Sequence, residues 1–237
     1  MNRNVILVSG KSASGKSASL RGLRDPEGVI YLCTESGKEL PFSSKFRSAN
    51  IVDPMQVFKA FEEADKINAH TIIIDTATYL MDMYESVYVL PSSDGRKAWS
   101  YYAQYWKRLM QQYVAQAKQN VVILAHTSDV YNESELIMET MVKVKGSLMN
   151  QGIESYFGQV ISTKKLPVSR LTDIHNDLLE ITEDDELVGV KYVFQTRLTK
   201  DTVNERIRGP LGLWSKEEVF IDNDLQKVLD RLHAYYT

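Results

Sequence analysis

The sequence predicts an α/β protein with a largely parallel central sheet flanked by helices and an antiparallel extension toward its C-terminal end. Short runs of β-branched residues alternate with longer helical patterns, which is typical of parallel strands joined by helices. The strand runs are apolar throughout, as expected for strands covered on both faces. Hydrophobic residues make up 43% of the 237 residues, which is enough for one continuous core. We therefore expect a single domain over residues 1–237.

Four apolar runs are the expected strands of the parallel sheet, and they should lie side by side. They are residues 5–8, 29–32, 72–74 and 121–124. A helix is expected after Asp53 and Pro54, which suit its cap and first turn, with an apolar stripe that continues to Ala64. The longest helix is expected at residues 99–117, where apolar residues keep three-four spacing over about five turns.

The C-terminal part of the chain is less regular. Residues 127–147 form a polar stretch without a clear period, so we expect a functional or partly disordered loop. Strands are expected at residues 157–163 and 188–199, with an acidic turn at residues 183–186 between them. Asn223 is expected to cap a final helix. The apolar face of that helix consists of Leu225, Val228, Leu229 and Leu232.

Charge and cysteine content exclude several classes of protein. The chain has 28 Lys and Arg against 31 Asp and Glu, a formal net charge of −3, so contact with nucleic acid requires a local basic patch. Cys33 is the only cysteine, which excludes an internal disulfide framework and fits a reducing cytoplasm. No stretch reaches the roughly 18 apolar residues of a membrane span. We therefore expect a cytoplasmic protein with no membrane partner.

Residues 10–17 match the phosphate-loop pattern G-x-x-x-x-G-K-[ST] in full, between an expected strand and an expected helix. The glycines let successive backbone N–H groups face the phosphates of a nucleotide. Lys16 adds a full positive charge, and the Ser17 hydroxyl can ligate Mg²⁺. The residues of the loop are Gly10, Lys11, Ser12, Ala13, Ser14, Gly15, Lys16 and Ser17. This motif predicts binding of a nucleoside triphosphate together with Mg²⁺.

Polar residues follow the ends of the next three expected strands. Asp75 stands where a ligand for a Mg²⁺-bound water belongs, although such a residue can also cap a helix. Glu35 can accept a proton from an attacking water, which favours hydrolysis over transfer to a substrate; a solvated loop carboxylate is the alternative. His126 can bond the γ-phosphate and report its loss, or it can be an ordinary structural histidine.

A basic segment near the C-terminus is a further candidate. Arg206 and Arg208 alternate, so in an extended segment both side chains point the same way. Together with Lys200 they can enter the nucleotide site of a neighbouring subunit and stabilise the charge of the transition state. The alternative is a solvated basic turn.

The order of these motifs resembles the RecA-type ATPase core, over roughly residues 3–210. Residues 206–212 are similar to the basic segment ending in Gly-Pro of hexameric replicative helicases, which reaches the ATP of the neighbouring subunit. The single-domain build more closely resembles phage-encoded RecA-core ATPases of single-strand annealing and recombination. Many RecA-type proteins have Gln at the sensor position held here by His126, so the switch differs in detail.

This resemblance implies a RecA-like P-loop NTPase fold and hydrolysis of ATP with Mg²⁺. It also implies a homo-oligomer, ring or filament, that acts on single-stranded DNA in phage recombination, annealing or repair. The compartment would then be the cytoplasm of a bacterial host, with phage single-strand-binding or replication proteins as further partners. Two other functions use the same loop: a small-molecule kinase, which requires an arginine-rich lid, and a nucleotide-switched adaptor such as a helicase-loading or packaging subunit.

The resemblance also points to segments that would line a DNA channel. These are residues 87–97 and 127–147, although the second segment carries more acidic than basic residues. Exposed aromatic rings stack on bases, and Tyr101 and Tyr105 are candidates, whereas Trp106 lies on the apolar stripe of the long helix. The basic residues in or near these segments are Arg96, Lys97, Lys143, Lys145, Lys164 and Lys165.

Overall fold

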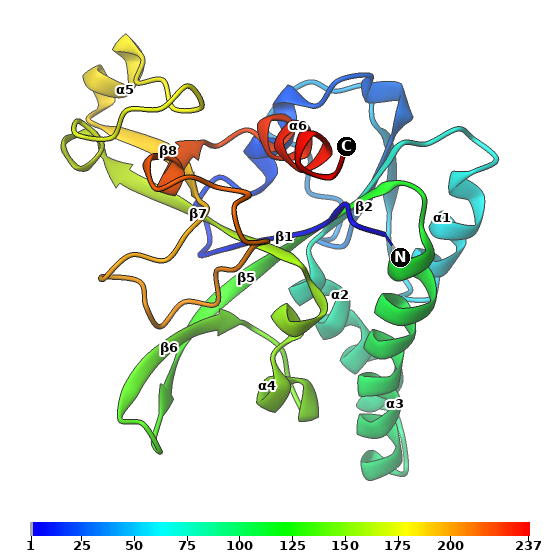
Figure 1. Cartoon of the computed structure of the whole chain (residues 1–237). Helices are drawn as coiled ribbons and strands as arrows, with labels where there is room; N and C mark the ends of the chain where they lie inside the picture. Colours follow the sequence, from blue (N-terminus) through cyan, green and yellow to red (C-terminus); the bar gives the residue numbers. More distant parts are fainter. Residues whose placement is uncertain (1) are drawn as a thin grey trace.

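The computed structural model describes residues 2–237, whose strands form a nine-stranded sheet (Figure 1). The strand order is β3-β2-β4-β5-β1-β7-β8-β9, and β6 (Ile137–Val142) pairs with β5 outside this path. The parallel strands are β1 (Val5–Gly10), β2 (Val29–Cys33), β3 (Arg47–Asn50), β4 (Thr71–Asp75), β5 (Asn120–Asn132) and β7 (Gln159–Pro167). The antiparallel extension consists of β8 (Val190–Gln195) and β9 (Phe220–Asp222).

The predicted fold class is confirmed by this topology. The four predicted strands lie side by side as β2, β4, β5 and β1. Because they are parallel, their carboxyl ends meet at one edge of the sheet, and the phosphate-loop strand β1 lies between β5 and β7. The polar residues that follow β1, β2, β4 and the central part of β5 are therefore brought to the same edge.

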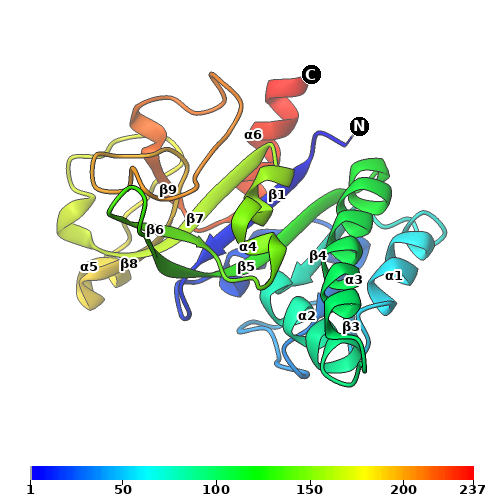
Figure 2. The same ribbon diagram turned by 90° about the horizontal axis from the view of Figure 1, so that it is seen from below.

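Helices cover both faces of the sheet (Figure 2). On one face lie α1 (Gln56–Ala64), α2 (Ala77–Tyr84) and α3 (Gly95–Arg108), with the short α4 (Ser147–Gln151) beside them. On the other face lie a 3₁₀ helix (Ser17–Gly22) and α6 (Leu225–Tyr236). Successive strand residues enter opposite layers: Ile72 and Ile74 pack under α1 to α3, whereas Ile73 packs under α6.

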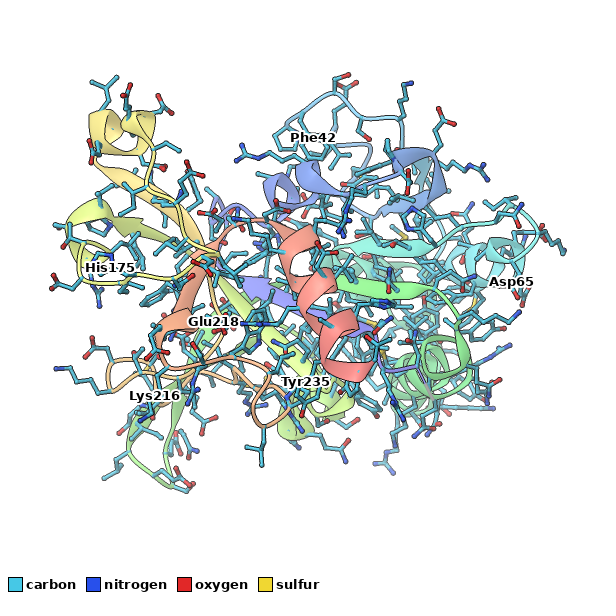
Figure 3. All side chains as sticks on the ribbon, turned by 45° about the horizontal axis from the view of Figure 1, so that its top comes forward. Phe42, Asp65, His175, Lys216, Glu218 and Tyr235 are labelled. Carbon is cyan, nitrogen blue, oxygen red and sulfur yellow. The ribbon has the colours of Figure 1, made fainter. Side chains whose placement is uncertain are left out.

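The longest helix is confirmed. After α3 the chain continues through a π-helical turn (Leu109–Tyr113) and a 3₁₀ turn (Val114–Gln116), so the helical path extends almost to Ala117. The final helix is also confirmed, and Tyr235 lies near its C-terminal end (Figure 3). The Tyr235 hydroxyl donates to the carbonyl of Leu211 at 2.8 Å. Within residues 2–237, no helix combines the length and the apolar character needed to cross a bilayer.

The loop predicted at residues 127–147 is wrong over most of its length. β5 continues to Asn132, and β6 (Ile137–Val142) returns antiparallel to it, with Thr127 opposite Val142. The resulting hairpin projects from the sheet at the lower left of Figure 1. Most of its side chains are exposed or half-buried. Because the hairpin has no fully buried face, its sequence lacks the alternation that marks a strand.

Smaller differences concern the ends of elements. The acidic turn predicted at residues 183–186 is instead the start of α5 (Glu183–Val188), because Thr182 and Asp185 form a capping box. The cap of α6 is Asp224, whose carboxylate accepts from the backbone N–H of Gln226 at 2.9 Å, and not Asn223. Strands β3 and β9 were not predicted, since β3 is wholly exposed and β9 has three residues.

Candidate functional site

The phosphate loop joins the carboxyl end of β1 to the 3₁₀ helix that begins at Ser17. A Cβ atom at Gly10 would lie 2.1 Å from the Thr163 hydroxyl of β7, and Gly15 has a φ of +98°, so both positions need glycine. The Ser14 hydroxyl bonds to the same Thr163 hydroxyl. The loop is therefore fixed against β7 in a conformation that side chains at its glycines would prevent.

Lys16 lies inside this loop. Its Nζ donates to the carbonyl oxygens of Gly10 at 3.0 Å and Lys11 at 2.8 Å. Burial lowers the pKa of Lys16 to about 8, although the nearby carboxylates of Asp75 and Glu35 act in the opposite direction. A buried ammonium held by two carbonyls is ready to exchange part of this shell for phosphate oxygens.

Asp75 lies at the end of β4, directly beside the loop. Its Oδ2 accepts from the Ser17 hydroxyl at 2.7 Å and from the Tyr31 hydroxyl at 2.8 Å. Burial raises the pKa of Asp75, and these two hydrogen bonds oppose that rise. Its Oδ1 is buried and has no hydrogen-bond partner among residues 2–237. A carboxylate oxygen of this kind next to a serine hydroxyl suits an oxygen-preferring cation such as Mg²⁺.

A chain of polar contacts connects Lys16 to Glu35. Lys16 Nζ lies 3.2 Å from Nδ1 of His126, and Nε2 of His126 lies 3.2 Å from Oε1 of Glu35. An ammonium only donates, so Nδ1 accepts and the ring proton resides on Nε2, from which it is donated to Glu35. Burial, with the charge of Lys16, lowers the pKa of His126 and favours this neutral form. The structure thus brings together three of the predicted site residues.

Lys38 was not identified from the sequence. Its Nζ lies 2.6 Å from Oε2 of Glu35, so both carboxylate oxygens of Glu35 have partners. It stands three residues after Glu35 in a turn, and a lone lysine in a loop carries no motif. The proximity of the two residues in sequence is the signal that was available.

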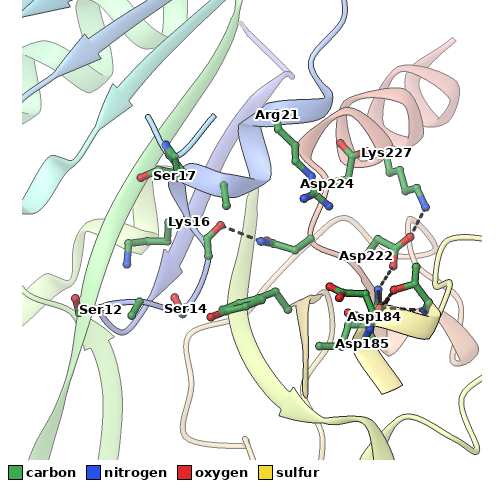
Figure 4. Close-up of a pocket in the computed structure, with 18 of the residues that line it drawn as sticks. Ser12, Ser14, Lys16, Ser17, Arg21, Asp184, Asp185, Asp222, Asp224 and Lys227 are labelled. Carbon is green, nitrogen blue, oxygen red and sulfur yellow. Dashed lines mark hydrogen bonds and ion pairs between the residues drawn. The ribbon is translucent and has the colours of Figure 1, made fainter. Parts of the chain in front are cut away.

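The loop lies on one side of a cavity of about 770 Å³, and the C-terminal part of the chain forms the other side (Figure 4). Glu35 also lines this cavity. On that far side, Lys191 pairs with Asp185 at 2.8 Å and with Asp222 at 3.2 Å. The Nδ2 group of Asn223 donates to the carbonyl of Gly15 at 2.9 Å, which fastens the start of α6 to the loop. The local sequence does not reveal whether Asn223 caps the final helix, as predicted, or bonds to the loop, as the structure has it.

The remaining predicted residues lie outside the cavity. Lys11 points away from it and pairs with Asp129 of the β5–β6 hairpin at 2.8 Å. Arg206 pairs with Glu139 at 3.2 Å and with Glu154 at 3.5 Å, while Arg208 and Lys200 are exposed. Among residues 2–237, neither these arginines nor Lys200 belongs to the cavity lining. A role for these residues at a nucleotide would therefore require the site of another subunit.

The candidate DNA-binding cations fall into two groups. Lys145 pairs with Asp82 and Glu85, and Lys164 pairs with Glu205, so their charges are compensated inside the chain. The other candidates are exposed and have no ion-pair partner among residues 2–237; they are Arg96, Lys97, Lys143 and Lys165. The exposed ring of Tyr101 lies 5.8 Å from Lys97 Nζ. The rings of Tyr105 and Trp106 are buried and belong to the core.

Comparison with known proteins found one family model that matches most of the chain. A family model described as "AAA domain" matches residues 2–177, which include the phosphate loop, Glu35, Asp75 and His126. None of the curated proteins compared matches the sequence. Among solved structures, a KaiC-like protein from the hyperthermophilic archaeon Pyrococcus horikoshii OT3 is 12% identical, with a TM-score of 0.46. That match covers 85% of this chain and 81% of the other.

Proposed function

The chain belongs to the AAA domain family, and on the geometry of its site we propose that it hydrolyses ATP with Mg²⁺. The observation that carries this proposal is the row of contacts from Lys16 through His126 to Glu35, beside a phosphate loop. These contacts place the Glu35 carboxylate on the side of the site where Lys16 would meet the terminal phosphate. Its neighbours Lys38 and His126 keep this carboxylate ionised.

Each residue then has a distinct task. The backbone N–H groups of the loop and Lys16 bind the phosphates. Ser17 and Asp75 would hold Mg²⁺, directly and through water, and the cation would neutralise charge on the phosphate oxygens. Glu35 accepts a proton from water as the water oxygen attacks the γ-phosphorus. When Lys16 turns to the phosphates it leaves Nδ1 of His126. The ring proton can then move from Nε2 to Nδ1, which donates to a γ-phosphate oxygen and releases Oε1 of Glu35.

Glu35→Gln tests this assignment, with Glu39→Gln as the matched control. Glu39 also lines the cavity but is exposed. Glu35→Gln is expected to bind ATP almost normally and to hydrolyse it at least about 100-fold more slowly, because the general base is lost. Glu39→Gln should behave as wild type. Unchanged hydrolysis by Glu35→Gln in a folded protein would contradict the proposal.

The proposal extends to an oligomer that acts on single-stranded DNA in recombination, annealing or repair, as the resemblance to phage-encoded ATPases implies. Arg96, Lys97 and Lys143 support it as exposed cations, and Tyr101 supports it as an exposed ring beside one of them. Steady-state ATPase rates measured alone, with single-stranded DNA and with duplex DNA test it. Stimulation by single-stranded DNA is expected; no response to either DNA would favour the nucleotide-switched adaptor.

The kinase alternative is disfavoured by the segment that faces the loop across the cavity. Its short helix α5 begins with four acidic residues, Glu183 to Glu186, and Asp184 and Asp185 line the cavity. A kinase lid of the expected type would bring arginines to the transferred phosphate. None of the cavity-lining residues that the structure describes between Glu180 and Lys227 is an arginine, so the lid that a kinase requires is missing from this side and hydrolysis is the reaction that the site favours.

A further inference from the structure

Lys38 lies in a tight turn that folds its side chain back onto Glu35. The backbone N–H of Lys38 donates to the carbonyl of Glu35 at 3.2 Å, and Gly37 has a φ of +77° between them. The Cys33 thiol donates to the carbonyl of Lys38 at 3.4 Å, which ties the turn to the end of β2. The backbone therefore sets where the ammonium can reach.

The Glu35 carboxylate has two partners, and only one of these contacts depends on whether a nucleotide is bound. His126 holds Oε1, but its other ring nitrogen contacts Lys16, so its position depends on whether Lys16 binds a phosphate. Lys38 holds Oε2 and has no such connection to the loop. The Lys38 side chain is 60% exposed, so this ion pair contributes little to stability. Its effect is on the orientation of the carboxylate, which is only 10% exposed.

Building on the proposed hydrolysis, we infer that Lys38 is a positioning residue that anchors Oε2 of Glu35 and so presents Oε1 to the attacking water. The water O–H bond breaks and its proton passes to Oε1. The water oxygen bonds to the γ-phosphorus, and the bond to the β–γ bridging oxygen breaks, so that ADP leaves with that electron pair. Lys38 touches none of the reacting atoms.

Charges around Glu35 give this anchoring a measurable signature. Burial alone would raise the pKa of Glu35, but the hydrogen bonds from Lys38 and His126 outweigh burial and hold that pKa below its ordinary value. The other charged groups that face this carboxylate are Lys16 and Asp75. Without Lys38, one of the two hydrogen bonds that lower the pKa of Glu35 is lost, while burial still raises it. The pKa of Glu35 therefore rises. Activity that needs ionised Glu35 is then lost at a higher pH as the solution is acidified.

The test compares Lys38→Met and Lys38→Arg with wild type. The control is Lys45→Met, because Lys45 is exposed and its nearest carboxylate, on Glu27, is 3.8 Å away. Affinity is measured with a fluorescent ATP analogue, and kcat is measured from pH 5 to 9. The Glu35 carboxylate is titrated by ¹³C NMR without nucleotide, and Glu35→Gln identifies its resonance.

For Lys38→Met we expect affinity within about threefold of wild type, kcat reduced about tenfold at pH 7 and the acidic limb moved to higher pH. The NMR midpoint of Glu35 should move the same way, and Lys38→Arg should restore both. Unchanged kcat and an unchanged midpoint in Lys38→Met would overturn the inference while leaving hydrolysis by Glu35 intact. A moved midpoint in a protein whose wild type does not hydrolyse ATP would overturn the proposed function instead.

Discussion

Asn223→Ala is expected to weaken ATP binding, although Asn223 is 208 residues from Gly15 in the sequence. Its Nδ2 donates to the carbonyl of Gly15 at 2.9 Å, at the point where the loop turns with a φ of +98°. A hydrogen bond of this kind stabilises its bound conformation by about 1 kcal/mol net. Because 1.4 kcal/mol corresponds to about tenfold in an equilibrium constant, the expected loss of affinity is about fivefold.

Asn223→Asp sharpens the same test. It keeps the shape of the side chain but replaces the donor by a carboxylate oxygen, which faces the Gly15 carbonyl and lies near bound phosphates. Its loss of affinity should therefore exceed about tenfold. Affinity is measured by titration with a fluorescent ATP analogue, and the unfolding midpoint is measured in parallel.

Asn2→Ala is the control for these variants, because Asn2 Nδ2 donates to the carbonyl of Gln119 at 2.8 Å, outside the cavity. It should lower stability to a similar extent and leave affinity unchanged. Wild-type affinity in both Asn223 variants would show that this bond plays no part in organising the loop.

Further changes test the other parts of the site. Lys16→Ala should abolish tight ATP binding in a folded protein, which calorimetric titration checks; retained affinity would contradict the phosphate-loop assignment. Asp75→Asn should raise the Mg²⁺ concentration for half-maximal ATPase by about tenfold or more, since it weakens the carboxylate that is proposed to hold a water of the metal. Arg206→Ala and Arg208→Ala should each lower the ATPase rate by up to about 10³-fold with little change in affinity. Mixing either variant with Lys16→Ala protein should restore some activity, and no rescue in a proven oligomer would exclude action across the interface.

The sequence predicted the core of the site because its signals are local. An apolar run followed by a polar residue marks the carboxyl end of a buried strand, and parallel pairing brings such ends together. Glu35, Asp75 and His126 were found in this way, although β5 continues past His126 to Asn132. Asp75 and His126 contact residues of the loop, and Glu35 contacts His126. The assignment of roles to Arg206 and Arg208 remains a prediction, since it concerns a second subunit.

What the sequence could not predict depends on contacts between distant segments. Asn223 looks like a helix cap because it stands next to the real one, Asp224, and only the packing of α6 against the loop reveals its donor role. The hairpin of β5 and β6 lacks a buried face, so its pairing leaves no alternating pattern. The turn at Lys38 is defined by backbone bonds that residue types alone do not encode.

The central place of β1 in the sheet also constrains how the chain acquires its fold. Val5 lies opposite Val121 of β5, and Ile6 lies opposite Gln159 of β7. The first strand of the chain therefore pairs with two strands that are synthesised much later. At about 5–20 residues per second, ribosomal synthesis would separate β1 from β7 by roughly 8 to 30 s. Pairing between such distant segments is also slow to form, because long loops must close first. A nascent chain therefore completes the surroundings of its phosphate loop only after β5 and β7 have been synthesised.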